Sequence, residues 1–157
     1  MQTERPLRGT RYEDDYAMWA EEQAAALAAG RFAALDLVNL ADEVGDLSRS
    51  LDHALTSHLK VLLAHLLKGE FQPERATRSW EFTERDQADD IEELLREAPS
   101  RRPRLEAMIP AAYRRARRLA ARETGLSPDT FPERPSQRML AGLHDALERA
   151  KREAASD

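Results

Sequence analysis

Cysteine does not occur in this 157-residue sequence, and aromatic side chains make up only 6% of it. Without cysteine the chain cannot form disulfides, zinc–thiolate sites, iron–sulfur clusters or a thiol nucleophile. A cysteine-free chain suits a reducing compartment, so we expect a cytoplasmic location. No apolar run approaches the ~20 residues that a membrane span requires, and the sequence therefore predicts no membrane association.

Glycine is also scarce, with six occurrences, and the motifs that glycine usually builds are missing. The sequence contains no glycine-rich phosphate loop, no dinucleotide-binding fingerprint and no Ser-His-Asp arrangement in a recognisable order. Histidine and carboxylates do not follow the Glu-x-x-His pattern of a di-metal carboxylate bundle. We therefore predict no catalytic residue, no metal and no cofactor, and we favour a non-enzymatic role.

Alanine, leucine, glutamate and arginine dominate the sequence, and these residues favour helices. Apolar residues recur at spacings of three and four rather than two. The sequence therefore predicts an all-α fold, an antiparallel bundle of four to five helices built on one long central helix. We expect a flexible N-terminus over 1–9, a single bundle domain over 10–150 and a fraying C-terminal tail over 151–157.

Several helix ends are predicted from capping chemistry. Thr10 and Glu13 form a capping box, so the first helix is expected to begin at Thr10. Gly69 is expected to end the central helix. The other predicted N-caps, whose side chains would accept from free backbone amides, are Asp36, Ser79 and Ser136.

The first half of the central helix carries a leucine seam. Its members are spaced 3-4-3-4, which is typical of coiled coils, and they are Leu37, Leu40, Val44, Leu47 and Leu51. We expect the chain's own helices to leave part of this seam uncovered. A homodimer, or another protein partner on the same helical surface, is the predicted consequence.

Charge separates the third and fourth predicted helices. Residues 81–97 hold eight acids against two arginines, whereas 101–122 hold eight arginines against one glutamate. Antiparallel packing would place these opposite charges side by side, and we favour this structural interpretation. The alternative is an anion- or nucleic-acid-binding face composed of Arg104, Arg115, Arg118 and Arg122. The formal net charge of −5 makes a nucleic-acid partner the less favoured of the two.

The end of the central helix supplies the other candidate site. His65 interrupts an apolar stripe, and antiparallel packing would bring it near the start of the third helix. We expect it to be buried and hydrogen-bonded to Glu84 or Gln87, since buried polar groups need partners. The alternative interpretation makes His65 a base or a ligand in a small-molecule or metal site, with Glu84 assisting.

Several segments together resemble a bacterial family of domains of unknown function, number twenty-nine. The clearest are the run Leu59–Lys68, the pair of segments Gln72–Arg75 and Arg78–Trp80, and the stretch Tyr12–Trp19. The resemblance covers Tyr12 to about Pro135 and implies an all-helical protein without an established activity. It also implies a helix–loop–helix junction that gathers His65, Gln72, Ser79 and Trp80. The last helix, 136–156, departs from the pattern.

Three hypotheses follow. The first is a non-enzymatic helical interaction or assembly module. The second is a small-ligand or metal-binding protein centred on His65. The third is anion binding through the arginine face of the fourth helix. The candidate polar cluster for the second comprises His65, Gln72, Ser79, Trp80, Glu84 and Gln87.

Overall fold

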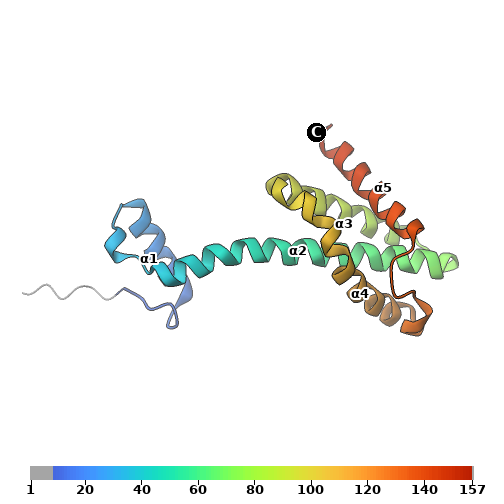
Figure 1. Cartoon of the computed structure of the whole chain (residues 1–157), viewed down its shortest axis with the longest axis horizontal. Helices are drawn as coiled ribbons and strands as arrows, with labels where there is room; N and C mark the ends of the chain where they lie inside the picture. The colour runs from blue at the N-terminus through green and yellow to red at the C-terminus, as the bar shows by residue number, and fades with distance from the viewer. Residues whose placement is uncertain (1–8, 157) are drawn as a thin grey trace, which may run out of the picture. The chain divides into compact units, whose positions relative to one another are not determined.

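A computed structural model describes residues 9–156, and this part of the chain is helical without a strand (Figure 1). None of its helices is long and apolar enough to cross a bilayer. The all-α prediction is therefore confirmed. The five α-helices are α1 (Tyr16–Ala28), α2 (Leu37–Phe71), α3 (Arg78–Glu97), α4 (Leu105–Thr124) and α5 (Gln137–Ala154). Four short 3-10 helices connect them: η1 (Phe32–Ala34), η2 (Pro73–Arg75), η3 (Pro99–Arg104) and η4 (Pro128–Thr130).

The described residues form two compact units, and the boundary falls within α2 between Arg49 and Ser50. The boundary lies inside one continuous helix, and the single domain expected over 10–150 stays a prediction. The physical reason for the boundary is the composition of α2: Leu55, Leu59 and Leu62 are fully buried, whereas Val44 and Leu47 are largely exposed. The expected flexible segment lies outside the described residues apart from Gly9.

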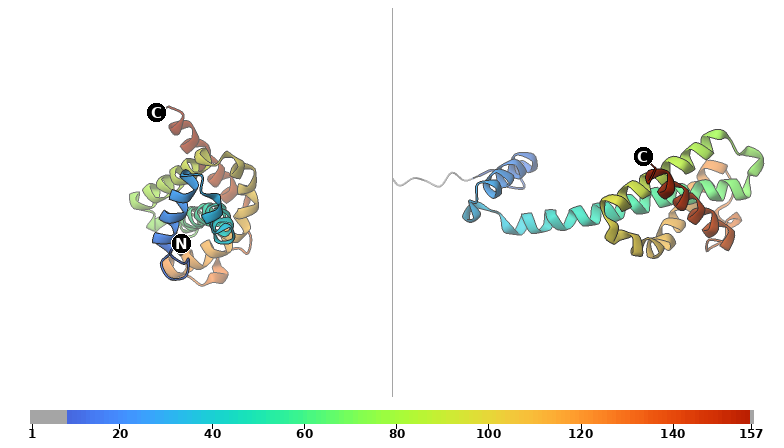
Figure 2. Two further views of the ribbon diagram at one scale, coloured as in Figure 1. Left: turned by 90° about the vertical axis from the view of Figure 1, so that its left-hand side faces the viewer. Right: turned by 90° about the horizontal axis from the view of Figure 1, so that it is seen from above.

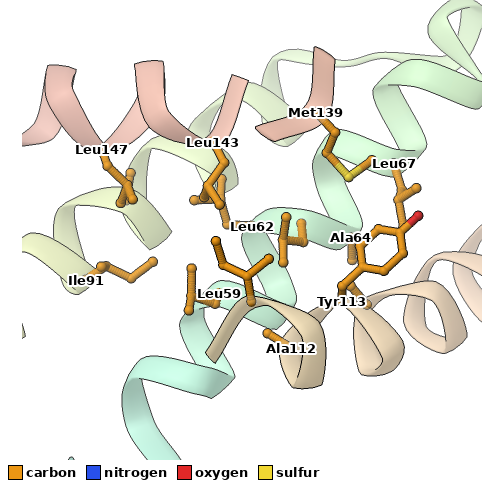
Figure 3. Packing of buried hydrophobic residues seen from close by; sticks show 14 of the residues in the cluster. Leu59, Leu62, Ala64, Leu67, Ile91, Ala112, Tyr113, Met139, Leu143 and Leu147 are labelled. Atoms are coloured by element: carbon orange, nitrogen blue, oxygen red, sulfur yellow. The ribbon is translucent and has the colours of Figure 1, made fainter. Parts of the chain in front are cut away.

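The second unit is a bundle in which α3, α4 and α5 gather around the C-terminal part of α2 (Figure 2). Its core is a continuous cluster of leucine, isoleucine and alanine together with Tyr113, Phe131 and Met139 (Figure 3). The helix α5 packs along α3, and Leu143 and Leu147 enter the core from it. Arg102 in η3 holds the carboxylate of Glu92 through two hydrogen bonds of 3.0 and 2.6 Å, which fixes the turn after α3.

The first unit consists of α1, η1 and the beginning of α2. Trp19, Gln23 and Ala26 are its buried residues. The Gln23 side chain accepts a 2.7 Å hydrogen bond from the backbone amide of Asp36, so the polar side chain is satisfied at the turn that leads into α2.

The predicted N-caps are confirmed at Asp36 and Ser136, whose side chains accept from Asn39 and Met139 amides at 3.3 and 3.1 Å. Thr10 is not an N-cap. It donates to the Glu22 carboxylate through its amide and its hydroxyl, at 2.7 and 2.8 Å, so the amide that a capping box would give to Glu13 is already bonded.

Four helix ends differ from the prediction. Asp15 caps α1 instead, accepting from the Met18 amide. Thr77 rather than Ser79 precedes α3. Gly69 has a helical backbone, so α2 continues to Phe71 and stops before Pro73; proline has no amide to extend the helix. The last helix extends to Ala154, beyond the expected fraying point.

Candidate functional site

Exposed apolar side chains are concentrated in the first unit. Of the large hydrophobic residues that are exposed among residues 9–156, all but Phe82 lie between positions 16 and 47. They are Tyr16, Met18, Leu27, Phe32, Leu37, Val38, Val44 and Leu47. An apolar surface of this kind on a folded unit is typical of an interaction site.

Three of these residues belong to the predicted leucine seam, and we call them the exposed seam: Leu37, Val44 and Leu47. Their exposed fractions are 68%, 65% and 72%. Leu40 between them is half-buried. Leu51 belongs to the other unit, where it packs against the core. The leucine seam is therefore exposed to solvent at Leu37, Val44 and Leu47, and is packed against the core from Leu51 onward.

The flank of the helix next to the seam is contacted by aromatic residues. The hydroxyls of Tyr12 and Tyr16 donate to the two carboxylate oxygens of Glu43, at 2.6 and 3.0 Å. These hydrogen bonds raise the pKa of Tyr12 to about 12 and also raise the pKa of Tyr16. The ring of Tyr12 meets Trp19 edge-on at 4.9 Å. Because Val44 is rotated from Glu43 by about 100° around the helix axis, these contacts leave the seam side open.

The candidate cluster around His65 is only partly assembled. His65 is buried, as expected, and its ring lies edge-on to Trp80 with 6.2 Å between centroids. Its Nδ1 has no hydrogen-bond partner among the described residues. Burial lowers the pKa of His65, and the charge of Lys68 lowers it further. Burial therefore favours the neutral imidazole, and a ligand-binding or catalytic role for His65 stays a prediction.

The expected hydrogen bond from His65 to Gln87 is absent, because the amide oxygen of Gln87 lies 3.0 Å from Nδ1 of His58 instead. His58 precedes His65 on α2 by seven residues, or about two turns of helix. Glu84 is not bonded to His65 either, and burial together with Glu81 raises the pKa of its carboxyl.

Gln72, before η2, and Ser79, in the first turn of α3, do not bond to His65 either. Ser79 is exposed, and its backbone oxygen accepts from Thr83. The Oε1 atom of Gln72 is buried without a hydrogen-bond partner in the described part of the chain. No group of three or more potential ligands in residues 9–156 is arranged to hold a metal ion.

Sequence reasoning missed the residue that organises this junction, which is Lys68. Its buried Nζ lies 2.7 Å from the Glu123 carboxylate and 4.4 Å from the centroid of the Trp80 ring. One ammonium thus links α2, α3 and α4 through an ion pair and a cation–π contact. The available signal was a lysine directly after a run of leucines on the buried side of a helix.

Of the charges expected to pair, Glu92 of 81–97 and Arg102 of 101–122 do form an ion pair, but Arg102 lies in η3 rather than in α4. In the described part of the chain, no ion pair joins α3 to α4. The acids of α3 pair elsewhere: Asp89 with Arg149 of α5, and Glu92 with Arg102 of η3. The reason is that α3 packs along α5 and η3.

The arginines proposed for anion binding are exposed to solvent. Arg104, Arg115, Arg118 and Arg122 are exposed and have no carboxylate partner among residues 9–156. The two acids of α4 are occupied on other helices, Glu106 by His144 and Glu123 by Lys68. Anion binding by this face stays a prediction.

A family profile described as domain of unknown function DUF29 matches residues 11–147. The chain belongs to the DUF29 family. Because the function of this family is unknown, membership assigns neither an activity nor a site residue. Among curated proteins and solved structures, none matches the chain.

The DUF29 match extends beyond Pro135 and includes most of α5. The expected departure of 136–156 from the family pattern is therefore wrong up to residue 147. The match also includes both structural units, so the exposed seam and the His65 junction both belong to the DUF29 domain.

Proposed function

We propose that this DUF29 protein is a non-enzymatic helical assembly module that self-associates through the exposed seam. The observation that carries the proposal is the confinement of exposed large apolar residues to positions 16–47, with Phe82 as the single exception in the described chain. Covering such residues releases water from apolar surface and drives association. A cytoplasmic, bacterial setting belongs to the same proposal and fits a cysteine-free chain.

The spacing of the seam supports a second copy as its occupant. Leu37, Leu40, Val44 and Leu47 follow the 3-4 pattern with which one helix packs into the same pattern on another. The pattern is self-complementary, so two copies of the chain present matching surfaces. A different protein could occupy the seam only if it carried apolar residues at the same 3-4 spacing on one of its own helices.

The residues beside the seam allow close approach of a second helix. Ala41 and Ser48 flank it and are small. The carboxylate on the other flank, Glu43, is held by the two tyrosine hydroxyls. Two copies can therefore approach without placing free like charges directly against each other.

A charge placed in the seam tests this function. In the Val44→Lys variant, the ammonium would have to be buried between the copies, so the dimer is expected to dissociate. Asp42→Lys is the matched control, because it places lysine on the same helix about 200° away from Val44. Size-exclusion chromatography with light scattering gives the mass of each protein.

We expect the mass of the natural chain and of Asp42→Lys to rise with concentration toward that of a dimer, while Val44→Lys stays monomeric. A natural chain that remains monomeric at every concentration overturns self-association. Equal behaviour of the two lysine variants overturns the assignment of the interface to the seam.

A further inference from the structure

The second unit contains a pocket that the assembly function does not use. It has a volume of about 550 Å³ and lies between α4 and the connection that precedes α5. Pro110, Tyr113 and Arg114 line it from α4, and Glu133, Arg134 and Pro135 line it from the connection. This volume lies within the range of small-molecule sites in proteins.

The wall formed by the connection is anchored to α4. The buried hydroxyl of Tyr113 donates to the backbone oxygen of Pro132 at 2.9 Å. The guanidinium of Arg117 donates to the backbone oxygens of Pro128 and Phe131, at 3.1 and 2.9 Å. Phe131 itself is buried. The pocket is therefore preformed, which reduces the ordering cost of binding a ligand.

The chemistry of the lining indicates the class of ligand. Arg114 and Arg134 are exposed and have no ion pair or hydrogen bond to any other described residue. Two guanidiniums suit a carboxylate, which accepts paired hydrogen bonds from them. Pro110, Pro135 and the edge that buried Tyr113 contributes form the apolar part of the lining, which suits a hydrocarbon body. Two arginines and Glu133 give the lining a formal net charge of +1, which is complementary to a ligand with a single negative charge.

We propose that this pocket binds a small organic carboxylate with a flat apolar body. The carboxylate lies between Arg114 and Arg134, and the body lies against Pro110, Tyr113 and Pro135. This inference goes beyond the assembly function and rests on different residues in the other unit. Loss of the dimer would leave it standing, and absence of binding would leave the assembly function standing.

Calorimetric titration with benzoate at low salt tests the pocket, because surface charges are least screened there. Benzamide is a neutral molecule of the same shape, and acetate carries the same charge without the ring. The protein variants are Arg114→Gln and Arg134→Gln. Arg115→Gln is the matched control, since it removes the adjacent exposed arginine of the same helix, which does not line the pocket.

We expect benzoate to bind saturably and at least about tenfold more tightly than benzamide or acetate. Arg114→Gln and Arg134→Gln should each weaken benzoate binding about tenfold, and Arg115→Gln should leave it unchanged. Unaltered thermal midpoints establish that all three variants are folded.

Three results would overturn the proposal. One is the absence of saturable benzoate binding up to about 10 mM. Another is equal weakening by Arg115→Gln, which would indicate general attraction to a basic surface. The last is equal binding of benzamide, which would indicate an apolar contact without carboxylate recognition.

Discussion

Removing Glu123 is predicted to destabilise the bundle more than removing the lysine that it pairs with. The Lys68 side chain is 6% exposed, whereas the Glu123 side chain is 39% exposed. Glu123→Ala therefore removes the carboxylate bonded to a buried ammonium, which keeps the Trp80 ring beside it and the weaker charge interaction with Glu84. Lys68→Met instead removes the buried charge and keeps most of the apolar length of the side chain.

The magnitude lies between two limits. Breaking a fully buried ion pair costs about 3–5 kcal/mol, and an exposed pair contributes about 0–1 kcal/mol. Because Glu123 is partly in water, we expect Glu123→Ala to lower the free energy of unfolding by about 2 kcal/mol. Lys68→Met should cost about 1 kcal/mol or less, since the carboxylate that remains is hydrated.

Urea denaturation followed by circular dichroism measures both variants and the double variant. In the Lys68→Met background, Glu123→Ala should lower the free energy of unfolding by less than about 0.5 kcal/mol, because there is no buried ammonium that would lose its partner. Equal losses in the two single variants, or full additivity in the double variant, would refute the reasoning that Lys68 depends on Glu123.

Three other predictions concern single groups. Glu43→Ala should shift the ionisation of Tyr12 from about 12 back toward the ordinary range near 10, which absorbance at alkaline pH detects; an unchanged titration would contradict the paired hydrogen bonds. The lowered pKa of His65 means that the unfolded chain takes up the proton first as the pH falls below the ordinary value of 6.5, so stability should decline over that range. His65→Phe should reduce this decline, and an unaltered pH dependence of urea unfolding would argue against it. Gly125 has a φ of 75°, so Gly125→Ala should destabilise the protein by about 1 kcal/mol. Gly69 is helical and a Cβ added there meets nothing within 4 Å, so Gly69→Ala should stabilise the protein by about 0.5–1 kcal/mol. Thermal midpoints of the two variants that shift in the same direction would contradict these two predictions.

Apolar spacing and capping residues predicted a helix correctly where no distant residue competed for the same groups. The central helix and its buried leucines follow from 3-4 spacing, and the serine cap of α5 follows from its side-chain oxygen. Thr10 shows the limit of such rules. Its capping box with Glu13 is locally sound, yet Glu22, a residue twelve positions away, takes both donors. Sequence spacing carries no information about such a competitor.

The candidate site was less predictable because it depends on which helices meet. His65 was correctly expected to be buried, but Gln87 bonds to His58, which lies seven residues earlier on α2. A register difference of two turns decides between the two histidines. The charge pattern of 81–122 likewise indicated that the acidic and basic helices would pair, whereas α3 packs along α5. The buried residues of α3 and α5 share one apolar core, and the acids of α3 form ion pairs with the arginines that this packing brings near, such as Arg149.

The absence of cysteine allows a direct test of the seam. A single Asp42→Cys variant carries a nitroxide on the side of α2 that faces away from Leu37, Val44 and Leu47. If two copies pack through the exposed seam, pulsed electron spin resonance should detect a distance between copies of roughly 20–35 Å, set by two helix diameters and the label arms. No dipolar coupling between copies, or a distance beyond roughly 50 Å, would contradict association through this seam.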